Sequence, residues 1–185
     1  QDGVWIDRRR ARESPHYMLG LNFLVANQVD QAIDELAKAA RAAGDPLEIH
    51  LILGNLYREK GQVGRAIQTH QDLLQRPNLR KLEHANVLLC LGLDYRSGGF
   101  VDRAIEAFNE VLKLDPDNRY ALSNLEKLHE DQHQWEQAYA ARQRLASLSG
   151  SGDGGPESPR HNEVLAFLEH EFGQAALRGR DYAEA

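Results

Sequence analysis

One stretch of the sequence has the residue types and the spacing of a catalytic metal site. The segment His129–His133, HEDQH, fits the pattern H-E-x-x-H, in which two histidines one helical turn apart bind zinc and the glutamate serves as a general base. The periodicity described below places His129 at an inward position of one helix and His133 in the turn after it. We therefore expect the two imidazoles not to share a helical face, and we predict no metal site and no catalytic residue.

Other catalytic chemistry has no support in the sequence. No phosphate-binding loop, activated nucleophile or pair of carboxylates is recognisable, so we expect no enzymatic activity and no cofactor in this fragment. The one cysteine, Cys90, rules out an internal disulfide framework and any multi-cysteine zinc site, and we expect it to be a small buried residue. The net charge of −6 is spread over interspersed acids and bases, which gives nucleic-acid binding no electrostatic support.

The remaining pattern is structural and it repeats. The stretch Leu88–Pro116 contains two amphipathic helices joined by a Gly-Gly turn, and the same template fits again upstream and downstream. Four alanines mark the second helices at intervals of 34, 38 and 34 residues: Ala32, Ala66, Ala104 and Ala138. Such a period is the tetratricopeptide one. With 42% apolar residues and few β-branched ones, it predicts an all-α fold, a tetratricopeptide repeat α-solenoid built as a right-handed superhelix of stacked helical hairpins.

Glycine stands in the middle of the first helix of three repeats, at Gly20, Gly54 and Gly92. A glycine inside a helix costs about 1 kcal/mol relative to alanine, which indicates a close approach to the second helix. We expect that second helix to present only a methyl group at this point, from the alanines just named. In the fourth repeat Glu126 replaces the glycine, so we expect looser packing there.

The composition of the chain changes outside the repeats. Residues 1–13 form a basic leader containing Trp5 and several arginines, either a solvated segment or a juxtamembrane one with the arginines on the cytoplasmic side. Residues 14–149 hold four repeats, and residues 150–160 form a flexible glycine- and serine-rich linker. Residues 161–185 match the first helix of a fifth repeat that is cut as its second helix begins, so we expect a fragment of a longer protein.

The register of the repeats predicts a groove for a protein partner. In stacked repeats the first helices line a concave face, which here carries leucines flanked by arginines. Such a stripe suits an amphipathic helix or a short apolar peptide of a partner. Alternatively, the chain's own leader, a missing C-terminal part or a second copy of the chain covers it. The predicted groove residues are Tyr17, Leu21, Leu24, Leu51, Asn55, Arg58, Leu89, Leu93, Arg96 and Tyr120.

Three segments carry a closer resemblance: GLNFLVANQVDQAIDELAKAA, EIHLILGNLYREKGQVGRAIQTHQDLLQRPNL and LGLDYRSGGFVDRAIEAFN. They resemble the opening repeats of the lipopolysaccharide assembly protein B family, which are bacterial inner-membrane proteins. The most specific part is GNLYREKGQVGRAIQTHQ, because His70 stands where the second helix of a repeat usually has an aromatic residue. The likeness covers Tyr17 to Leu148 and resumes more weakly from Asn162 to the end.

The resemblance implies a function that the residues alone do not indicate. Members of that family carry one N-terminal membrane helix, cytoplasmic repeats and a C-terminal rubredoxin-like metal domain. It implies a non-enzymatic adaptor at the cytoplasmic face of the inner membrane, which presents a lipid A biosynthetic deacetylase to a membrane-bound protease. The fragment would then contact the membrane only through a helix absent from the printed sequence. The alternative is a self-associating repeat scaffold, a homo-oligomer, with a different partner.

Overall fold

The computed structural model describes residues 14–42, 46–77 and 79–148, and in them the chain is entirely α-helical. The predicted leader, linker and fifth repeat lie outside these ranges. No helix in the described ranges combines the length and the apolar character that crossing a bilayer requires. The helices are α2 (Pro15–Val25), α3 (Val29–Ala42), α4 (Leu47–Glu59), α5 (Val63–Leu74), α6 (Lys81–Ser97), α7 (Val101–Leu114), α8 (Arg119–Asp131) and α9 (Trp135–Ser147).

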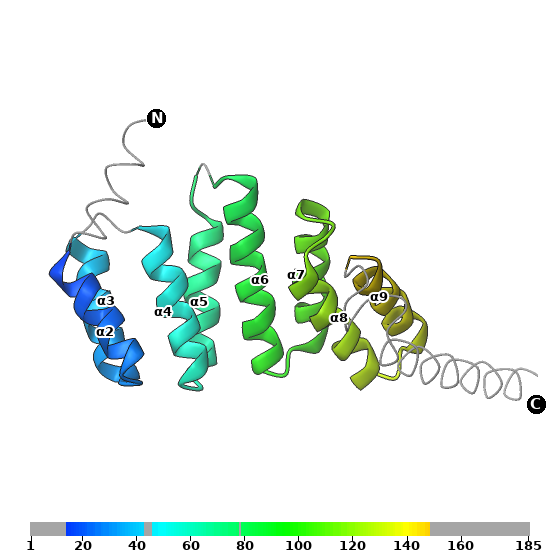
Figure 1. The fold of residues 1–185 in the computed structure, drawn as a ribbon, viewed down its shortest axis with the longest axis horizontal. Helices are drawn as coiled ribbons and strands as arrows, with labels where there is room; N and C mark the ends of the chain where they lie inside the picture. Colours follow the sequence, from blue (N-terminus) through cyan, green and yellow to red (C-terminus); the bar gives the residue numbers. More distant parts are fainter. Residues whose placement is uncertain (1–13, 43–45, 78, 149–185) are drawn as a thin grey trace, which may run out of the picture. The chain divides into compact units, whose positions relative to one another are not determined.

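The chain divides into two compact units, Gln1–Ala104 and Ile105–Ala185, with the boundary inside α7. In the first unit α2 packs on α3 and α4 packs on α5, and contacts of α3 with α4 and of α5 with α6 join successive hairpins (Figure 1). In the second unit α8 packs on α9. In the first unit each hairpin therefore leaves an apolar face for its neighbour in the chain to cover, which is the packing rule of repeat proteins.

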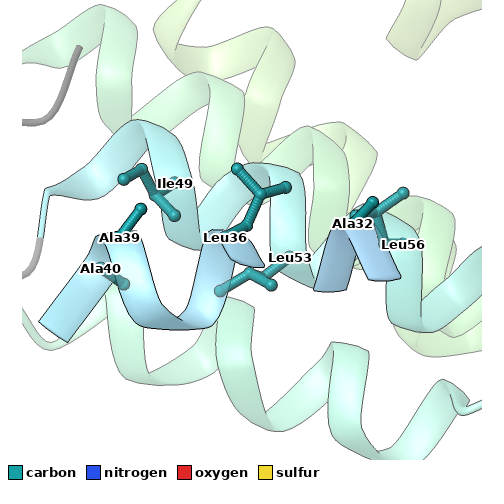
Figure 2. Close-up of a cluster of buried hydrophobic side chains, with 7 residues drawn as sticks. All are labelled: Ala32, Leu36, Ala39, Ala40, Ile49, Leu53 and Leu56. Atoms are coloured by element: carbon teal, nitrogen blue, oxygen red, sulfur yellow. The ribbon is translucent and has the colours of Figure 1, made fainter. Parts of the chain in front are cut away.

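Figure 2 shows how the first two hairpins share a core. Residues of α3 and α4 interdigitate there, and each is at most 4% exposed: Ala32, Leu36, Ala39, Ala40, Ile49, Leu53 and Leu56. Tyr17, Phe23 and Tyr57 pack against this cluster from its edge. All four alanines that marked the repeat period are fully buried, so their predicted inward placement is confirmed.

The glycines allow the expected close approach, but the residue that faces them differs from the prediction. A Cβ added to Gly20 would lie 2.8 Å from Cγ of Leu36, and one added to Gly54 would lie 2.4 Å from Nε2 of His70. The prediction of a bare methyl group from the alanine was wrong, because a large side chain four residues later fills the space that the missing Cβ leaves. We call this position of the second helix the slot residue. Phe108 holds the equivalent sequence position in the third repeat and is also fully buried.

An ion pair takes this place in the fourth repeat. Glu126, at the glycine position, is 8% exposed, and its Oε1 lies 3.8 Å from Nε of Arg142, the slot residue of α9. Burial, together with the nearby Glu130, raises the pKa of the Glu126 carboxyl, while Arg142 opposes the rise. Glu126 replaces the glycine and Arg142 replaces the apolar slot residue, and the two substitutions compensate each other because the side chains form an ion pair.

The turn between the two helices of each repeat has one backbone geometry. Its key residue has a positive φ, at Asn27 (56°), Gly61 (72°), Gly99 (75°) and His133 (57°). The following residue donates its N–H to the carbonyl five positions back, at 2.8 to 2.9 Å, and so closes the helix end. Glycine adopts this left-handed conformation without strain, whereas a side chain such as that of His133 disfavours it.

We predict that His133→Gly stabilises the protein. Glycine removes the strain of a left-handed histidine but adds disorder to the unfolded chain, so we expect a net gain of about 0.5–1 kcal/mol in the free energy of unfolding. Gly61→Ala, the reverse change at the equivalent turn, is expected to lower that free energy by about 1 kcal/mol. Urea unfolding of the three proteins is the measurement, and a destabilised His133→Gly variant would contradict the shared turn geometry.

We predict that Gly54→Ala destabilises the protein by about 1–3 kcal/mol, because the new methyl group collides with a fully buried imidazole. Gly64→Ala is the matched control. No heavy atom lies within 4 Å of a Cβ at Gly64, so alanine there should be stabilising by about 0.4–1 kcal/mol. Thermal unfolding of the two variants checks the difference, and equal melting temperatures would show that the slot is not tightly filled.

Candidate partner-binding groove

Nine of the ten predicted groove residues lie on the first helices of the hairpins in the first unit, and each is partly buried: Tyr17, Leu21, Leu24, Leu51, Asn55, Arg58, Leu89, Leu93 and Arg96. The structure brings the α4 and α6 members together, since these two helices pack on each other. Tyr120 belongs to the second unit, where it is 74% exposed at the start of α8.

The leucines of α4 and α6 form the apolar part of this surface. Leu51 of α4 and Leu89 and Leu93 of α6 are partly exposed, whereas Leu53 and Leu91 on the same helices are buried in the core. A helix that packs its own core with one set of leucines and leaves a second set in contact with water carries a candidate binding surface. We call the surface of these two helices the α4–α6 groove.

Arg58 has a different role from the one expected. Its Nη1 donates a hydrogen bond to Oδ1 of Asp94 at 2.8 Å and a longer one, 3.5 Å, to the carbonyl oxygen of Cys90. The Asp94 side chain is fully buried and that of Arg58 is 18% exposed. A buried carboxylate needs a cation. The guanidinium of Arg58 therefore neutralises the charge of Asp94, in the next repeat of the same chain, whether or not a partner is bound.

His70 completes the cluster around Asp94. Its Nδ1 lies 2.5 Å from the second oxygen of the Asp94 carboxylate, and the side chain is fully buried. Burial lowers the pKa of this imidazole, but hydrogen bonds and charge interactions with Asp94 and Cys90 outweigh that effect and raise the pKa to about 9. Nε2 of His70 is buried and faces Gly54, without a hydrogen-bond partner among the described residues.

One carboxylate therefore connects three helices, α4 through Arg58, α5 through His70 and α6 through Asp94 itself. We call these three residues the Asp94 cluster. It joins the second and third repeats next to the α4–α6 groove, because Arg58 is one of the predicted groove residues and Asp94 directly follows Leu93 on α6. Removing one member would leave a buried charge without compensation, which typically costs about 3–5 kcal/mol.

Sequence reasoning noted His70 but missed Asp94. Aligning the repeats could have found Asp94, because the equivalent positions in the second and fourth repeats hold the buried residues Leu56 and Leu128. The slot position likewise holds Leu36 in the first repeat. Polar residues at two positions that hold buried leucines in other repeats indicate that the two side chains meet in the core.

The residues of the H-E-x-x-H pattern do not form a metal site. His129 lies in the last turn of α8, with Nδ1 2.7 Å from Oε1 of Gln134. His133 lies two residues beyond the end of that helix, in the left-handed turn, with its ring next to that of Trp135. The two imidazoles therefore do not project from one helical face, and the described residues contain no group of metal-ligating side chains that could hold an ion.

We predict that the Asp94 cluster makes stability depend on pH. The pKa of His70 is raised from 6.5 to about 9. The contribution of His70 to the free energy of unfolding is therefore complete below pH 6.5 and is lost as the pH rises through about 9. The free energy of unfolding should fall across this window by at most about 1.4 kcal/mol per pH unit. Urea unfolding at several pH values is the measurement. His70→Leu, which installs the slot residue of the first repeat, should remove the slope, and an unchanged slope in that variant would contradict the assignment.

Comparison with protein-family models identifies the type of repeat. Family models described as tetratricopeptide repeat match residues 17–78 and residues 85–118. The two matches span the first three hairpins. The fourth hairpin, where Glu126 and Arg142 replace the usual pair, is outside both.

Among curated proteins the chain is similar to lipopolysaccharide assembly protein B. The Escherichia coli (strain K12) protein is 34% identical over 155 residues, which is 79% of this chain and 40% of the relative. The Haemophilus influenzae protein is 28% identical over 191 residues, 94% of this chain and 46% of the relative. The chain thus spans less than half the length of the curated relatives it matches.

Solved structures show the same fold at low sequence identity. A tetratricopeptide repeat protein from Parabacteroides merdae has a TM-score of 0.70 at 17% identity, covering 90% of this chain and 61% of its own. PilF of Pseudomonas aeruginosa has a TM-score of 0.68 at 20% identity, with coverages of 90% and 72%. YrrB, a repeat protein with an unusual peptide-binding site, has a TM-score of 0.61 at 19% identity, with coverages of 75% and 70%. The all-α solenoid fold is thereby confirmed.

Proposed function

The chain belongs to the tetratricopeptide repeat family, as a non-catalytic interaction scaffold, and we propose that its α4–α6 groove holds an apolar segment of a protein partner. The observation that carries the proposal is the row of partly exposed leucines Leu51, Leu89 and Leu93, set on helices that the Asp94 cluster joins. A surface whose backbone is already held in place loses little conformational entropy on binding. Partners that present an amphipathic helix or a short apolar strand suit such a surface.

The other predicted residues of the first unit would extend this groove. Tyr17, Leu21 and Leu24 offer further partly buried apolar surface on α2. Tyr120, an exposed ring on α8 of the second unit, would be a contact of its own. Arg96, partly exposed at the end of α6, would orient acidic residues at the edge of the groove. Arg58 contributes to this indirectly, since its guanidinium is committed to Asp94.

The biological setting that we propose follows from the similarity to lipopolysaccharide assembly protein B. In it the protein regulates lipopolysaccharide synthesis by presenting a lipid A biosynthetic deacetylase to a membrane-bound protease, at the cytoplasmic face of the bacterial inner membrane. The repeats would carry no cofactor and bind no nucleic acid. Self-association through the same leucines, with a different partner, is the second candidate, because an apolar groove can also be filled by a second copy.

The test is binding of the purified deacetylase to groove variants, measured by biolayer interferometry. Leu89→Asp and Leu93→Asp should each weaken binding roughly 10- to 100-fold, because a carboxylate forced into an apolar contact costs about 1–3 kcal/mol. Leu112→Asp is the matched control. It makes the same change at a partly exposed leucine of α7, which is not one of the two groove helices, and it should bind as the wild type does.

The outcomes separate the two candidates. Retained binding by the groove variants, with unchanged melting temperatures, would overturn the groove as the partner site. Absence of binding by the wild type, combined with a dimer in analytical ultracentrifugation that Leu93→Asp dissociates, would favour self-association. The polar but uncharged Leu93→Gln should show an intermediate effect and serves where the aspartate variant folds poorly.

A further inference from the structure

Helix α6 extends beyond the part of it that the predicted groove residues cover. It has 17 residues, against 13 in α4. At the interval of 38 residues between these two repeats, Leu47, where α4 begins, corresponds to Ala85, four residues inside α6. The added turn, at the upper end of α6 in Figure 1, contains Leu82, whose side chain is 67% exposed. A leucine this exposed at the end of a packed helix is a candidate contact.

Leu82 continues the line of the groove leucines on α6. Leu82, Asn86, Leu89 and Leu93 follow one another at intervals of four, three and four residues, so they lie along one face of the helix. Asn86 is exposed and the two inner leucines are partly exposed, whereas Leu91 is buried in the core. We call these four residues the α6 stripe.

The spacing of the α6 stripe matches that of a second helix. Side chains that recur every 3.5 residues on a helix rise by about 5.2 Å at each step, and a helix lying alongside repeats its own side chains at the same rise. On a strand, the side chains of one face are about 6.6 Å apart. An extended segment would therefore fall out of step with the stripe by about 4 Å over its three intervals.

The main chain of the occupant leads to the same conclusion. The backbone N–H and C=O groups inside α4 and α6 bond within their own helices. The polar side chains set among the groove leucines are the amides of Asn55 and Asn86, and the guanidinium of Arg58 is committed to Asp94. An extended segment would thus bring unpaired backbone groups against leucines at a cost in free energy, whereas a helix pairs its own.

Asn86 adds a polar position to this apolar face. An apolar side chain placed over its carboxamide would remove water from a donor and an acceptor and replace neither bond. An asparagine or glutamine of the partner at the same level can bond to both groups. A single amide in an apolar seam fixes the alignment of two paired helices in this way. The α6 stripe therefore specifies a spacing and one polar level.

We propose that the occupant of the α4–α6 groove is an amphipathic helix of a partner protein, whose apolar side chains follow the α6 stripe and whose amide side chain faces Asn86. The proposal rests on the proposed function, which admits a helix or a strand, and it adds two binding residues. Leu82 lengthens the apolar contact by one helical turn, and Asn86 selects partners that present a polar residue at its level.

Labelled peptides of about 16 residues, or about four helical turns, test the proposal with the full 185-residue chain. All are built from alanine, glutamate and lysine, which favour a helix. The leucine probe has four leucines at the spacing of the α6 stripe. In the two amide probes asparagine replaces the second or the third leucine, so that one probe suits each direction of the bound helix. In the proline probes a central alanine of each amide probe becomes proline, which breaks the helix.

Fluorescence anisotropy measures the affinities. One amide probe should bind the wild type at least about three times more tightly than the leucine probe, because its asparagine pairs with Asn86. Asn86→Leu should reverse that preference, which a purely structural role of Asn86 would not do. The matching proline probe should bind at least about tenfold more weakly than its parent, although its leucines are unchanged.

Leu82→Asp should weaken binding of the preferred amide probe roughly tenfold, because it places a carboxylate in an apolar contact. Leu82 and Asn86 are both exposed, so their variants should keep the melting temperature of the wild type. Leu112→Asp, at a partly exposed leucine of α7, is the matched control and should bind as the wild type does.

The remaining outcomes separate this proposal from the proposed function. Equal binding of a proline probe and its parent would overturn the helix in favour of an extended segment. Binding of the purified deacetylase that Leu89→Asp weakens, without binding of any helical probe, would overturn the helix and leave the groove. Probe binding as expected, with deacetylase binding that Leu89→Asp leaves unchanged, would support the helical site and overturn the deacetylase as its partner. A dimer in analytical ultracentrifugation that Leu82→Asp dissociates would overturn the proposal by assigning the α6 stripe to a second copy of the chain.

Discussion

The carboxylate of Asp94 imposes the main constraint on the first unit of this protein. Buried without a charge partner it would be strongly unfavourable, and the two cations that compensate it come from the preceding repeat, Arg58 on α4 and His70 on α5. Apolar packing between repeats tolerates small shifts of one helix against another, whereas a hydrogen-bonded charge cluster is satisfied only in one arrangement. The relative position of α4, α5 and α6, and therefore the surface they present, depends on that arrangement.

The slot beside the mid-helix glycine explains how His70 reaches this cluster. In the first repeat the slot residue is Leu36, and the space vacated by Gly20 admits its branched end. In the second repeat the same space beside Gly54 admits an imidazole, which brings a polar ring into an otherwise apolar layer. The fourth repeat keeps the position but places the charge pair of Glu126 and Arg142 in it. The slot position thus holds an apolar side chain in one repeat and a charged or polar one in another. Neighbouring repeats can therefore differ in their cores while their backbones stay alike.

Helix α4 contributes to a candidate binding surface because it is enclosed on some sides only. Its core residues, Ile49, Leu53 and Leu56, pack against α3, and Arg58 connects it to α6. Between these contacts it leaves Leu51 of the α4–α6 groove on one side and the residues that line a pocket on another. In a repeat scaffold, binding uses the surfaces that the stacking of hairpins leaves exposed. The stacking also holds these surfaces in fixed positions.

The sequence by itself determined the all-α class, the repeat period and the inward alanines, because each is a matter of residues spaced along one helix or one hairpin. The same local reasoning placed His133 in a turn, so the apparent zinc motif could be set aside. Only the tertiary structure decided that the slot is filled by Leu36 or His70, that Asp94 is buried, and that Arg58 is committed to it. The reason is distance along the chain. The Asp94 contacts join residues 24 and 36 positions apart, and the partner of a buried charge is set by which helices stack, which no periodicity in a single helix records.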